Sequence, residues 1–598
     1  MAGNGSLDLA VIGNCQVAAL IDRAGSIVWA CWPRPDGDPI FCALLDAEGP
    51  AAKRGIFGIE LRDQIDAQQE YVRNTAIVKT RLRASDGEVL VTDFCPRFRL
   101  HGRVFRPAVL VRVIEPKQGR PFVRLRLHPS LDYGAATPEV TSGSHHIRFV
   151  GEEIAFRVTT NASLAALERD LMFVVDRPIT IVLGPDETVE EQLNVLSQRW
   201  LEATRDYWTE WVRTLAIPFD WQEAVIRAAI TLKLCTYEDT GAVLAALTTS
   251  IPEVAGTVRN WDYRYCWLRD AFFVIQTLNR LGATRTMEGF LRFIDHVVTQ
   301  EAWDELRPLY PISGVAIAEE RVAPALGGYR GMGPVRVGNE AAGQRQYDVY
   351  GSLVLASAQL YFDERLAARG DRASLTTLEL IGQQAIHSFG KPDAGPWEFR
   401  GTVRPHTFSA MMCWAACDRL NRIATRVGAP ERAAEWAAEA ARMREAVLAQ
   451  AWSPSANSFL STLDGAGDLD ATLLLMPELG LIEPSDPRFL ATLAAIEAAL
   501  LVEGLIMRYR HADDFGVPAN AFTVCSFWYV NALAMVGRRA DAVRYFEALL
   551  ARRNHVGLLS EDIDPKSGEL WGNFPQTYSL VGIIGTAIRL SRPWEGAI

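Results

Sequence analysis

Several carboxylates crowd one short stretch near the end of the chain. The segment VGLLSEDIDPKSGELWGNFPQ (556–576) lies between two apolar segments of helical periodicity, and its Gly and Pro residues are typical of a loop. Its acidic residues are Glu561, Asp562, Asp564 and Glu569. Because the loop also holds Trp571 and Phe574, it combines groups that transfer protons with rings on which a ligand can stack.

A second acidic candidate, Glu398, lies between Trp397 and Phe399. Such apolar neighbours predict a raised pKa for Glu398, which would keep it protonated near neutrality, as a general acid must be. Glu561 follows Ser560 in a more polar loop and is expected to stay ionised. Glycoside hydrolysis requires a pair divided in this way: one acid protonates the leaving oxygen, and one carboxylate activates water or attacks the sugar. Spacing alone does not select these two among the 72 acidic residues, since most loop glutamates are solvated or cap helices.

Other polar and aromatic clusters fall in long loops of the same half of the chain. They are TVRNWDYRYCWLRDA (257–271), GYRGMGPVRVGNEAAGQRQYD (328–348), PDAGPWEFRG (392–401) and IMRYRHADDFGVPANAF (506–522). Trp and Tyr occur in them with Arg, Asp and Glu, which suits a sugar, because aromatic faces cover its C–H surfaces and charged groups bind its hydroxyls. No Walker sequence or Rossmann fingerprint follows a predicted strand, so nucleotide chemistry is disfavoured.

Helical periodicity runs through the chain from about residue 187 to its end. The predicted helices of the C-terminal part are 220–237, 267–281, 284–299, 345–367, 372–389, 407–427, 430–452, 468–478, 486–500, 522–537, 539–553 and 575–591. Short and long connections alternate between them, and short ones force neighbouring helices to run antiparallel. In a closed ring, all the long loops then emerge on one face. The pattern predicts an α/α toroid of six hairpins with its binding site on that rim.

The region from about 8 to 185 instead contains short β-rich runs separated by turn signals. Examples are SIVWACW, EVLVTDFC and VRLRLHPSL. Many short strands at this spacing predict an antiparallel sandwich. The fold class is therefore multidomain, with an N-terminal β-sandwich followed by a helical toroid.

The composition and net charge disfavour several classes of binding partner. The net charge of −11 disfavours nucleic acid and anionic membranes, which are bound through basic patches. The chain has no apolar run of about 18 residues and its first residues lack the pattern of a secretory signal. Nine scattered cysteines suit reduced thiols, and no Cys/His spacing predicts a metal site. We expect a cytoplasmic location, no membrane partner and no bound metal; a homo-oligomer stays open.

Together these motifs resemble glycoside hydrolase family 15, which contains glucoamylases, glucodextranases and bacterial trehalases. The matching segments are DYRYCWLRDA, GNEAAGQRQYDVYG, PDAGPWEFRG, CSFWYVNALAMVGR, LLSEDIDPKSGELWGNFPQTYS and the N-terminal IGNCQVAALIDRAGSIVWACWPRPD. The resemblance implies a β-sandwich domain (1–190), a linker helix (191–217) and a catalytic (α/α)6 barrel (218–598). It also implies hydrolysis of terminal α-glucosidic bonds with inversion and without a cofactor.

The resemblance assigns roles to individual residues. It implies that Glu398 is the general acid and Glu561 the general base. The residues implied to bind the terminal glucose are Tyr263, Trp267, Arg269, Asp270, Trp397 and Arg508. Of these, Arg269 and Asp270 would hold the sugar hydroxyls, and the aromatic residues would form the walls of the subsite.

Two departures from the family pattern bear on what lies beyond the scissile bond. The helix after the acid reads HTFSAMMCW, with Ala410 where a Lys is usual, so an ammonium group that could orient the leaving group is missing. The loop DDFGVPANAF also lacks the frequent GGE run.

An enzyme inside the cell meets small soluble glucosides rather than starch. Trehalose is the first expectation for the substrate, because many bacterial members of the family with this N-terminus resemble trehalases. Maltooligosaccharides or isomaltose form the alternative. A phosphorylase would need no second carboxylate, so Glu561 argues against one. A non-catalytic carbohydrate-binding protein is the remaining possibility.

Overall fold

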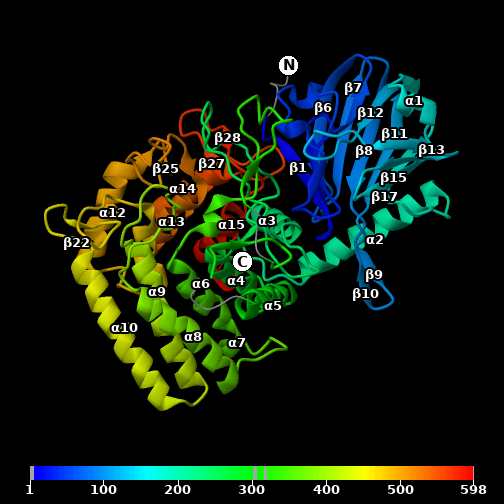
Figure 1. Cartoon of the computed structure of the whole chain (residues 1–598). Coiled ribbons are helices and arrows are strands. Elements are labelled where there is room, and N and C mark those ends of the chain that lie inside the picture. The colour runs from blue at the N-terminus through cyan, green and yellow to red at the C-terminus, as the bar shows by residue number, and fades with distance from the viewer. Residues whose placement is uncertain (1–5, 301–305, 316–318, 597–598) are drawn as a thin grey trace.

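The computed structural model describes residues 6–300, 306–315 and 319–596, which form a β-rich part and a helical part (Figure 1). The β-rich part is a sandwich of two antiparallel sheets. One sheet has the spatial order β1 (Leu9–Gly13), β2 (Ala18–Asp22), β3 (Ile27–Trp32), β5 (Ile56–Leu61), β12 (Phe122–His128) and β16 (Phe173–Val174), with β4 (Asp38–Phe41) beside β3. The other has the order β13 (Glu139–Ser142), β14 (His146–Val150), β15 (Ala155–Thr160), β17 (Ile179–Pro185), β11 (Leu110–Gly119), β8 (Gly87–Phe94), β7 (Val78–Ala84) and β6 (Gln64–Tyr71).

Burial along the strands explains why these segments pair. In β12 every second residue is buried, as expected for a strand with one face on the core. β3 is buried at every position, because it also faces the helical part: Trp29 Nε1 donates a 2.8 Å hydrogen bond to the Leu247 carbonyl. The two parts consequently share one continuous hydrophobic core.

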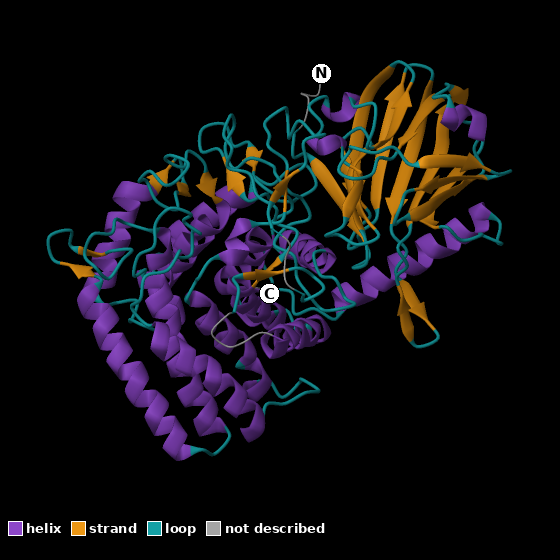
Figure 2. Ribbon diagram, in the orientation of Figure 1, coloured by secondary structure: helices purple, strands orange, loops and turns teal. Residues whose placement is uncertain are grey.

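A long helix, α2 (Leu193–Arg213), leads from the sandwich to the helical part (Figure 2). Its Trp200 and Leu201 pack on a small cluster of the eight-stranded sheet that contains Phe94 and Val182. This helix therefore covers sheet surface that would otherwise be exposed.

The helical part is a ring of inner helices surrounded by outer ones. The inner segments are α4 (Leu268–Arg280), α6 (Asp348–Ser357), α9 (Thr407–Arg426), η4 (Ala471–Leu475) with α11 (Met476–Leu479), α13 (Thr523–Met535) and α15 (Thr577–Leu590), and each contacts the next until α15 returns to α4. The outer helices are α3 (Gln222–Leu234), α5 (Thr284–Gln300), α8 (Arg372–Ser388), α10 (Pro430–Gln450), α12 (Pro487–Leu500) and α14 (Arg539–Leu550). The predicted antiparallel sandwich followed by an (α/α)6 barrel is thus confirmed.

Two of the predicted helices differ from those observed. The segment predicted at 345–367 is divided into α6 and the short α7 (Gln359–Phe362). The segment predicted at 468–478 is a 3₁₀ turn, η4, followed by the single turn of α11. Pro477 explains the second difference, because it lacks the N–H group that one continuous α-helix would need at that position.

Every inner helix follows a long loop, so the N-terminal ends of the inner helices gather on one rim. The partial positive charge of a helix N-terminus stabilises nearby anions.

In α13 the side chains are buried on almost all sides, as expected for a helix that is apolar around its whole circumference. No helix in the described part of the chain combines the length and the apolar composition needed to cross a bilayer.

The sandwich holds the first rim loop in place through Arg264. This side chain is 1% exposed and forms a 2.7 Å ion pair with Asp262. It also donates hydrogen bonds to the Gly37 carbonyl (2.7 Å) and the Tyr133 hydroxyl (2.8 Å), both in the sandwich. Tyr263, between the two ion-paired residues, is therefore fixed from behind by the N-terminal part.

We expect Arg264→Ala to destabilise the protein by about 3–5 kcal/mol, because it leaves the buried Asp262 carboxylate without its cation. The apparent free energy of unfolding in urea measures this loss. Arg23→Ala is the control, since Arg23 is 53% exposed and pairs with Asp8 at 3.4 Å on the surface. A loss no larger than that of the control would contradict a structural role for Arg264.

Candidate active site

A single pocket collects side chains from the N-terminal ends of the inner helices. It encloses about 1020 Å³ of empty space, a figure that includes open solvent at its mouth. Its lining includes Trp267 before α4, Asn339 before α6, Glu398 before α9, Thr472 in η4, Phe522 before α13 and Gln576 before α15. The predicted convergence of the long loops on one rim is therefore observed.

Arg269 ties three of these loops together. Its guanidinium donates to Asp348 Oδ2 (3.2 Å), Gln346 Oε1 (2.8 Å) and Glu398 Oε1 (2.9 Å). The side chain is 8% exposed and begins in the first turn of α4. Because the planar fork of an arginine holds its partners in fixed directions, Arg269 orients the Glu398 carboxylate.

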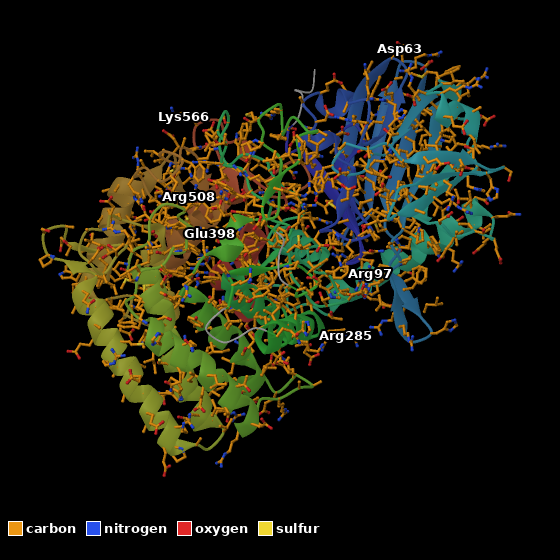
Figure 3. The ribbon with its side chains drawn as sticks, in the orientation of Figure 1. Asp63, Arg97, Arg285, Glu398, Arg508 and Lys566 are labelled. Atoms are coloured by element: carbon orange, nitrogen blue, oxygen red, sulfur yellow. The ribbon has the colours of Figure 1, made fainter. Side chains whose placement is uncertain are left out.

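Glu398 adopts an unusual backbone conformation, with φ of 61°. A non-glycine residue in the left-handed region is strained, and such strain is concentrated at functional sites. Its Oε1 accepts hydrogen bonds from Trp267 Nε1 (2.7 Å) and Arg269 Nη2 (2.9 Å). No described residue donates to its other oxygen, Oε2, which leaves that oxygen available to a ligand. Figure 3 places Glu398 and Arg508 close to each other in the upper part of the helical region.

Glu561 is completely buried behind the pocket wall. It precedes β27 (Asp562–Ile563), the central strand of a small sheet with β26 (Ala521–Phe522) and β28 (Leu570–Trp571). The Asn573 N–H donates a 3.0 Å hydrogen bond to Glu561 Oε2, while Oε1 is buried without a hydrogen bond of normal geometry from the described residues. Gly572, at φ 72°, permits this approach, since a Cβ there would lie 2.7 Å from Oε2.

Burial raises the pKa of Glu561 to about 8, and repulsion from Glu253 adds to the shift. The Tyr263 hydroxyl interacts with the same carboxylate and lowers its pKa. The expectation that Glu561 is the more solvated, readily ionised carboxylate is therefore wrong. The expectation of apolar surroundings for Glu398 is also wrong, because charged and polar donors meet its carboxylate. The sequence neighbours predicted the wrong environment for both carboxylates, because the fold buries the loop of Glu561 more deeply than the loop of Glu398.

Arg508 lies opposite a carboxylate that the sequence did not single out. Its guanidinium pairs with Glu253, which is 4% exposed and also accepts a 2.9 Å hydrogen bond from Trp261 Nε1. Arg259 pairs with Asp513 and lies 3.8 Å from Glu253. These contacts form a buried charge network in the wall of the pocket, next to Glu561.

Asp270 lines the pocket from the first turn of α4, where it is 8% exposed. Burial raises its pKa to about 7, against the attraction of Arg269. The Tyr578 hydroxyl interacts with it and lowers the pKa. Asp270 and Tyr578 thus present buried polar groups to the pocket.

Aromatic rings form the remaining walls. Tyr263 and Trp267 pack edge to face with ring centroids 5.1 Å apart. Trp397 lies in a cluster with Phe522 and Trp528, at centroid distances of 5.9 Å and 6.3 Å, and its Nε1 donates to Asp470. Flat apolar faces beside polar floor groups match the two surfaces of a sugar ring.

The structure brings seven of the eight predicted site residues together in the lining of this pocket, and Glu561 is the exception. Those that line the pocket are Tyr263, Trp267, Arg269, Asp270, Trp397, Glu398 and Arg508. Glu561 interacts with Tyr263 from behind this lining. Burial raises the pKa of Tyr263 well above its usual range, and the charges of Glu561, Glu253 and Glu398 raise it further. Tyr263 therefore lies within electrostatic reach of both proposed catalytic carboxylates.

The chain matches two family models. The model of the glycosyl hydrolases family 15 covers residues 220–588, and that of the trehalase-like N-terminal domain covers residues 7–162. This chain belongs to glycosyl hydrolases family 15. It is therefore a glycoside hydrolase.

Relatives and a solved structure agree with this family. A trehalase of Mycobacterium tuberculosis is 31% identical over 632 residues, covering 99% of this chain and 90% of that protein. A trehalase of Thermoplasma volcanium is 31% identical over 593 residues, covering 97% of this chain and 92% of that protein. A bacterial glucoamylase in complex with acarbose has the same fold, with a TM-score of 0.66 at 13% identity, over 98% of this chain and 94% of that one.

Ala410 bears on the recognition of the leaving group in this family member. It is 2% exposed in α9 and is not among the residues that line the pocket.

The described residues contain no group of three or more His, Cys, Asp and Glu side chains placed to hold a metal ion.

The buried Glu561 predicts a pH-dependent stability. A carboxyl group whose folded pKa lies near 8, above about 4.5 when exposed, binds its proton more tightly in the folded protein. Its contribution to stability is complete below about pH 4.5 and is lost as the pH rises to about 8. Glu561→Gln removes the ionising group, so we expect this variant to gain thermal stability over the unchanged protein across that range. The same substitution at the exposed Glu547 of α14 is the control; a gain that does not grow with pH would contradict the assignment.

Proposed function

We propose that this glycoside hydrolase cleaves the terminal α-glucosidic bond of small soluble glucosides, and that trehalose is its substrate. The support is that trehalases align with it over nearly the full length of both proteins, including the N-terminal domain. The pocket lining includes the buried polar groups of Asp270 and Tyr578, which suit the binding of the hydroxyls of one terminal glucose. The working location proposed for it is the cytoplasm.

One observation carries the mechanism: Tyr263 lies within electrostatic reach of both Glu398 and Glu561, and each carboxylate keeps one oxygen without a regular hydrogen bond. In the proposed reaction Glu398 Oε2 gives a proton to the glycosidic oxygen, and the C1–O bond breaks. Glu561 takes a proton from a water molecule, whose oxygen bonds to C1 from the opposite face of the ring. The products are β-glucose and the released sugar, so the configuration at C1 is inverted.

The environment of Glu561 suits the role of a base. A raised pKa makes the ionised carboxylate a stronger proton acceptor, and a value near the working pH leaves a useful fraction of the group ionised. The orphaned Oε1 is the atom proposed to hold the attacking water, because a buried acceptor gains a hydrogen bond when water enters.

Hydrolysis of trehalose can be tested directly. We expect glucose release from trehalose to exceed that from maltose and isomaltose at equal concentrations, without added phosphate. The Glu398→Gln protein, purified in the same way, is the control for contaminating enzymes. Preferential hydrolysis of maltose or isomaltose would contradict the substrate and favour the alternative, and glucose release only with phosphate would indicate a phosphorylase.

Separate substrates distinguish the two carboxylates. We expect Glu398→Gln and Glu561→Gln each to lower kcat for trehalose by about 10²- to 10⁴-fold, the usual contribution of general acid–base groups. With α-glucosyl fluoride, whose fluoride leaves without protonation, Glu398→Gln should retain far more activity than Glu561→Gln. Glu569→Gln, in the same loop as the buried Glu561 but with a side chain that is 39% exposed, is the matched control. Near-normal turnover of trehalose by either active-site variant would refute its role.

A further inference from the structure

Arg400 occupies the mouth of the pocket, two residues beyond Glu398. Its guanidinium carbon lies 4.4 Å from the ring centroid of Trp261, and its side chain is 20% exposed. A guanidinium stacked on an aromatic face is held in one plane, so its N–H groups point in fixed directions.

Carboxylates from another rim loop hold the same guanidinium. Its Nη1 donates to Glu340 Oε2 (2.6 Å) and its Nη2 to Glu320 Oε2 (3.1 Å). An arginine carries five N–H donors. These two bonds are the side-chain hydrogen bonds of Arg400 within the described residues, so further donors stay available to a ligand.

The backbone around Arg400 is also fixed. The N–H groups of Arg400 and Gly401 donate to the two carboxylate oxygens of Asp514, at 2.6 Å and 3.0 Å. A Cβ at residue 401 would lie 2.5 Å from Asp514 Oδ1, so only glycine allows this close approach. The loop that carries the proposed acid is thereby locked to the loop that precedes α13.

The ring beneath Arg400 is held in turn. Trp261 Nε1 donates to Glu253, the Arg336 guanidinium lies 5.1 Å from the Trp261 ring centroid, and Phe515 packs against its edge at 5.0 Å. With two guanidinium groups over it, this tryptophan serves to position Arg400 rather than to stack on a sugar.

The position of Arg400 along the pocket indicates which sugar it meets. Asp270 and Tyr578 are buried lining residues, whereas Asp514 and Glu340, which bind Arg400, are exposed to solvent. The proposed acid, Glu398, must reach the glycosidic oxygen between the two sugars. Glu398 therefore marks the boundary between the two sugar subsites. A terminal glucose bound by Asp270 and Tyr578 places the second, leaving sugar on the solvent side, where Arg400 lies.

We propose that Arg400 is a specificity-determining residue that binds the hydroxyls of the leaving sugar. The inference rests on the proposed function and extends it to the second subsite. A fixed, charged donor selects a polyhydroxylated leaving group over an apolar one, because its N–H groups would lose water without compensation beside an apolar group.

The test compares two donors that share the terminal glucose. Trehalose carries a second sugar, and α-glucosyl fluoride carries only fluoride in its place. We expect Arg400→Ala to lower kcat/KM for trehalose about ten- to a hundredfold more than kcat/KM for α-glucosyl fluoride, as expected for the loss of a charged hydrogen bond. Arg400→Lys should show a smaller change in the same ratio, since an ammonium keeps the charge but not the fork.

Arg404→Ala is the matched control, because Arg404 lies in the same loop, pairs with Asp464 at 3.2 Å and is not among the pocket-lining residues. Its ratio of the two kcat/KM values should equal that of the unchanged enzyme. Equal losses on both donors in Arg400→Ala, or no loss on trehalose, would overturn the inference while leaving the proposed function intact. An unchanged enzyme inactive on both donors would instead overturn the proposed function, and this inference with it.

Discussion

Buried negative charge is the constraint on which this site depends. Taking a carboxylate out of water costs several kcal/mol unless a cation and hydrogen bonds compensate. On the rim, four buried carboxylates each form an ion pair with a buried arginine, which compensates for the lost solvation. The pairs are Asp262–Arg264, Asp348–Arg269, Asp513–Arg259 and Glu253–Arg508. Among the described residues, neither Glu561 nor Asp562 forms an ion pair with an arginine of its own, and burial raises the pKa of both. The loop of residues 556–576 therefore carries buried carboxylates whose charges are only partly compensated.

The same constraint explains why the sandwich is joined so closely to the barrel. Arg264 could neutralise Asp262 alone, yet its remaining N–H groups need acceptors because the side chain is buried. Those acceptors, the Gly37 carbonyl and the Tyr133 hydroxyl, belong to the sandwich. Tyr263 is next in sequence to Arg264, so the N-terminal part fixes a wall of the pocket without contributing to its lining.

Sequence periodicity predicted the barrel because helices and connection lengths are local properties, and the observed α9 and α10 begin at the predicted residues. The family motifs identified Arg269 and Glu398 because both lie within short, distinctive segments. The sequence could not reveal the pairing of Glu253 with Arg508, which are separated by 255 positions. The electrostatics of Glu561 were mispredicted for a related reason: its pKa depends on burial under loops from elsewhere in the chain, not on its polar neighbours Ser560 and Asp562.

The left-handed backbone conformation at Glu398 allows one short turn to orient several side chains of the site. A strained residue of this kind costs about 1–3 kcal/mol, and a glycine there would remove the strain but also the acid. The turn lets consecutive side chains diverge to separate partners: Trp397 to Asp470, Glu398 to Arg269, Phe399 to a stack on His406 and Arg400 to Trp261. Each of these contacts holds the turn in its strained form, so the carboxyl group of the proposed acid is oriented before a sugar arrives. Because Glu398 and Arg400 share this turn, the group that would protonate the glycosidic oxygen and the group proposed to bind the leaving sugar are fixed relative to each other by the same few bonds.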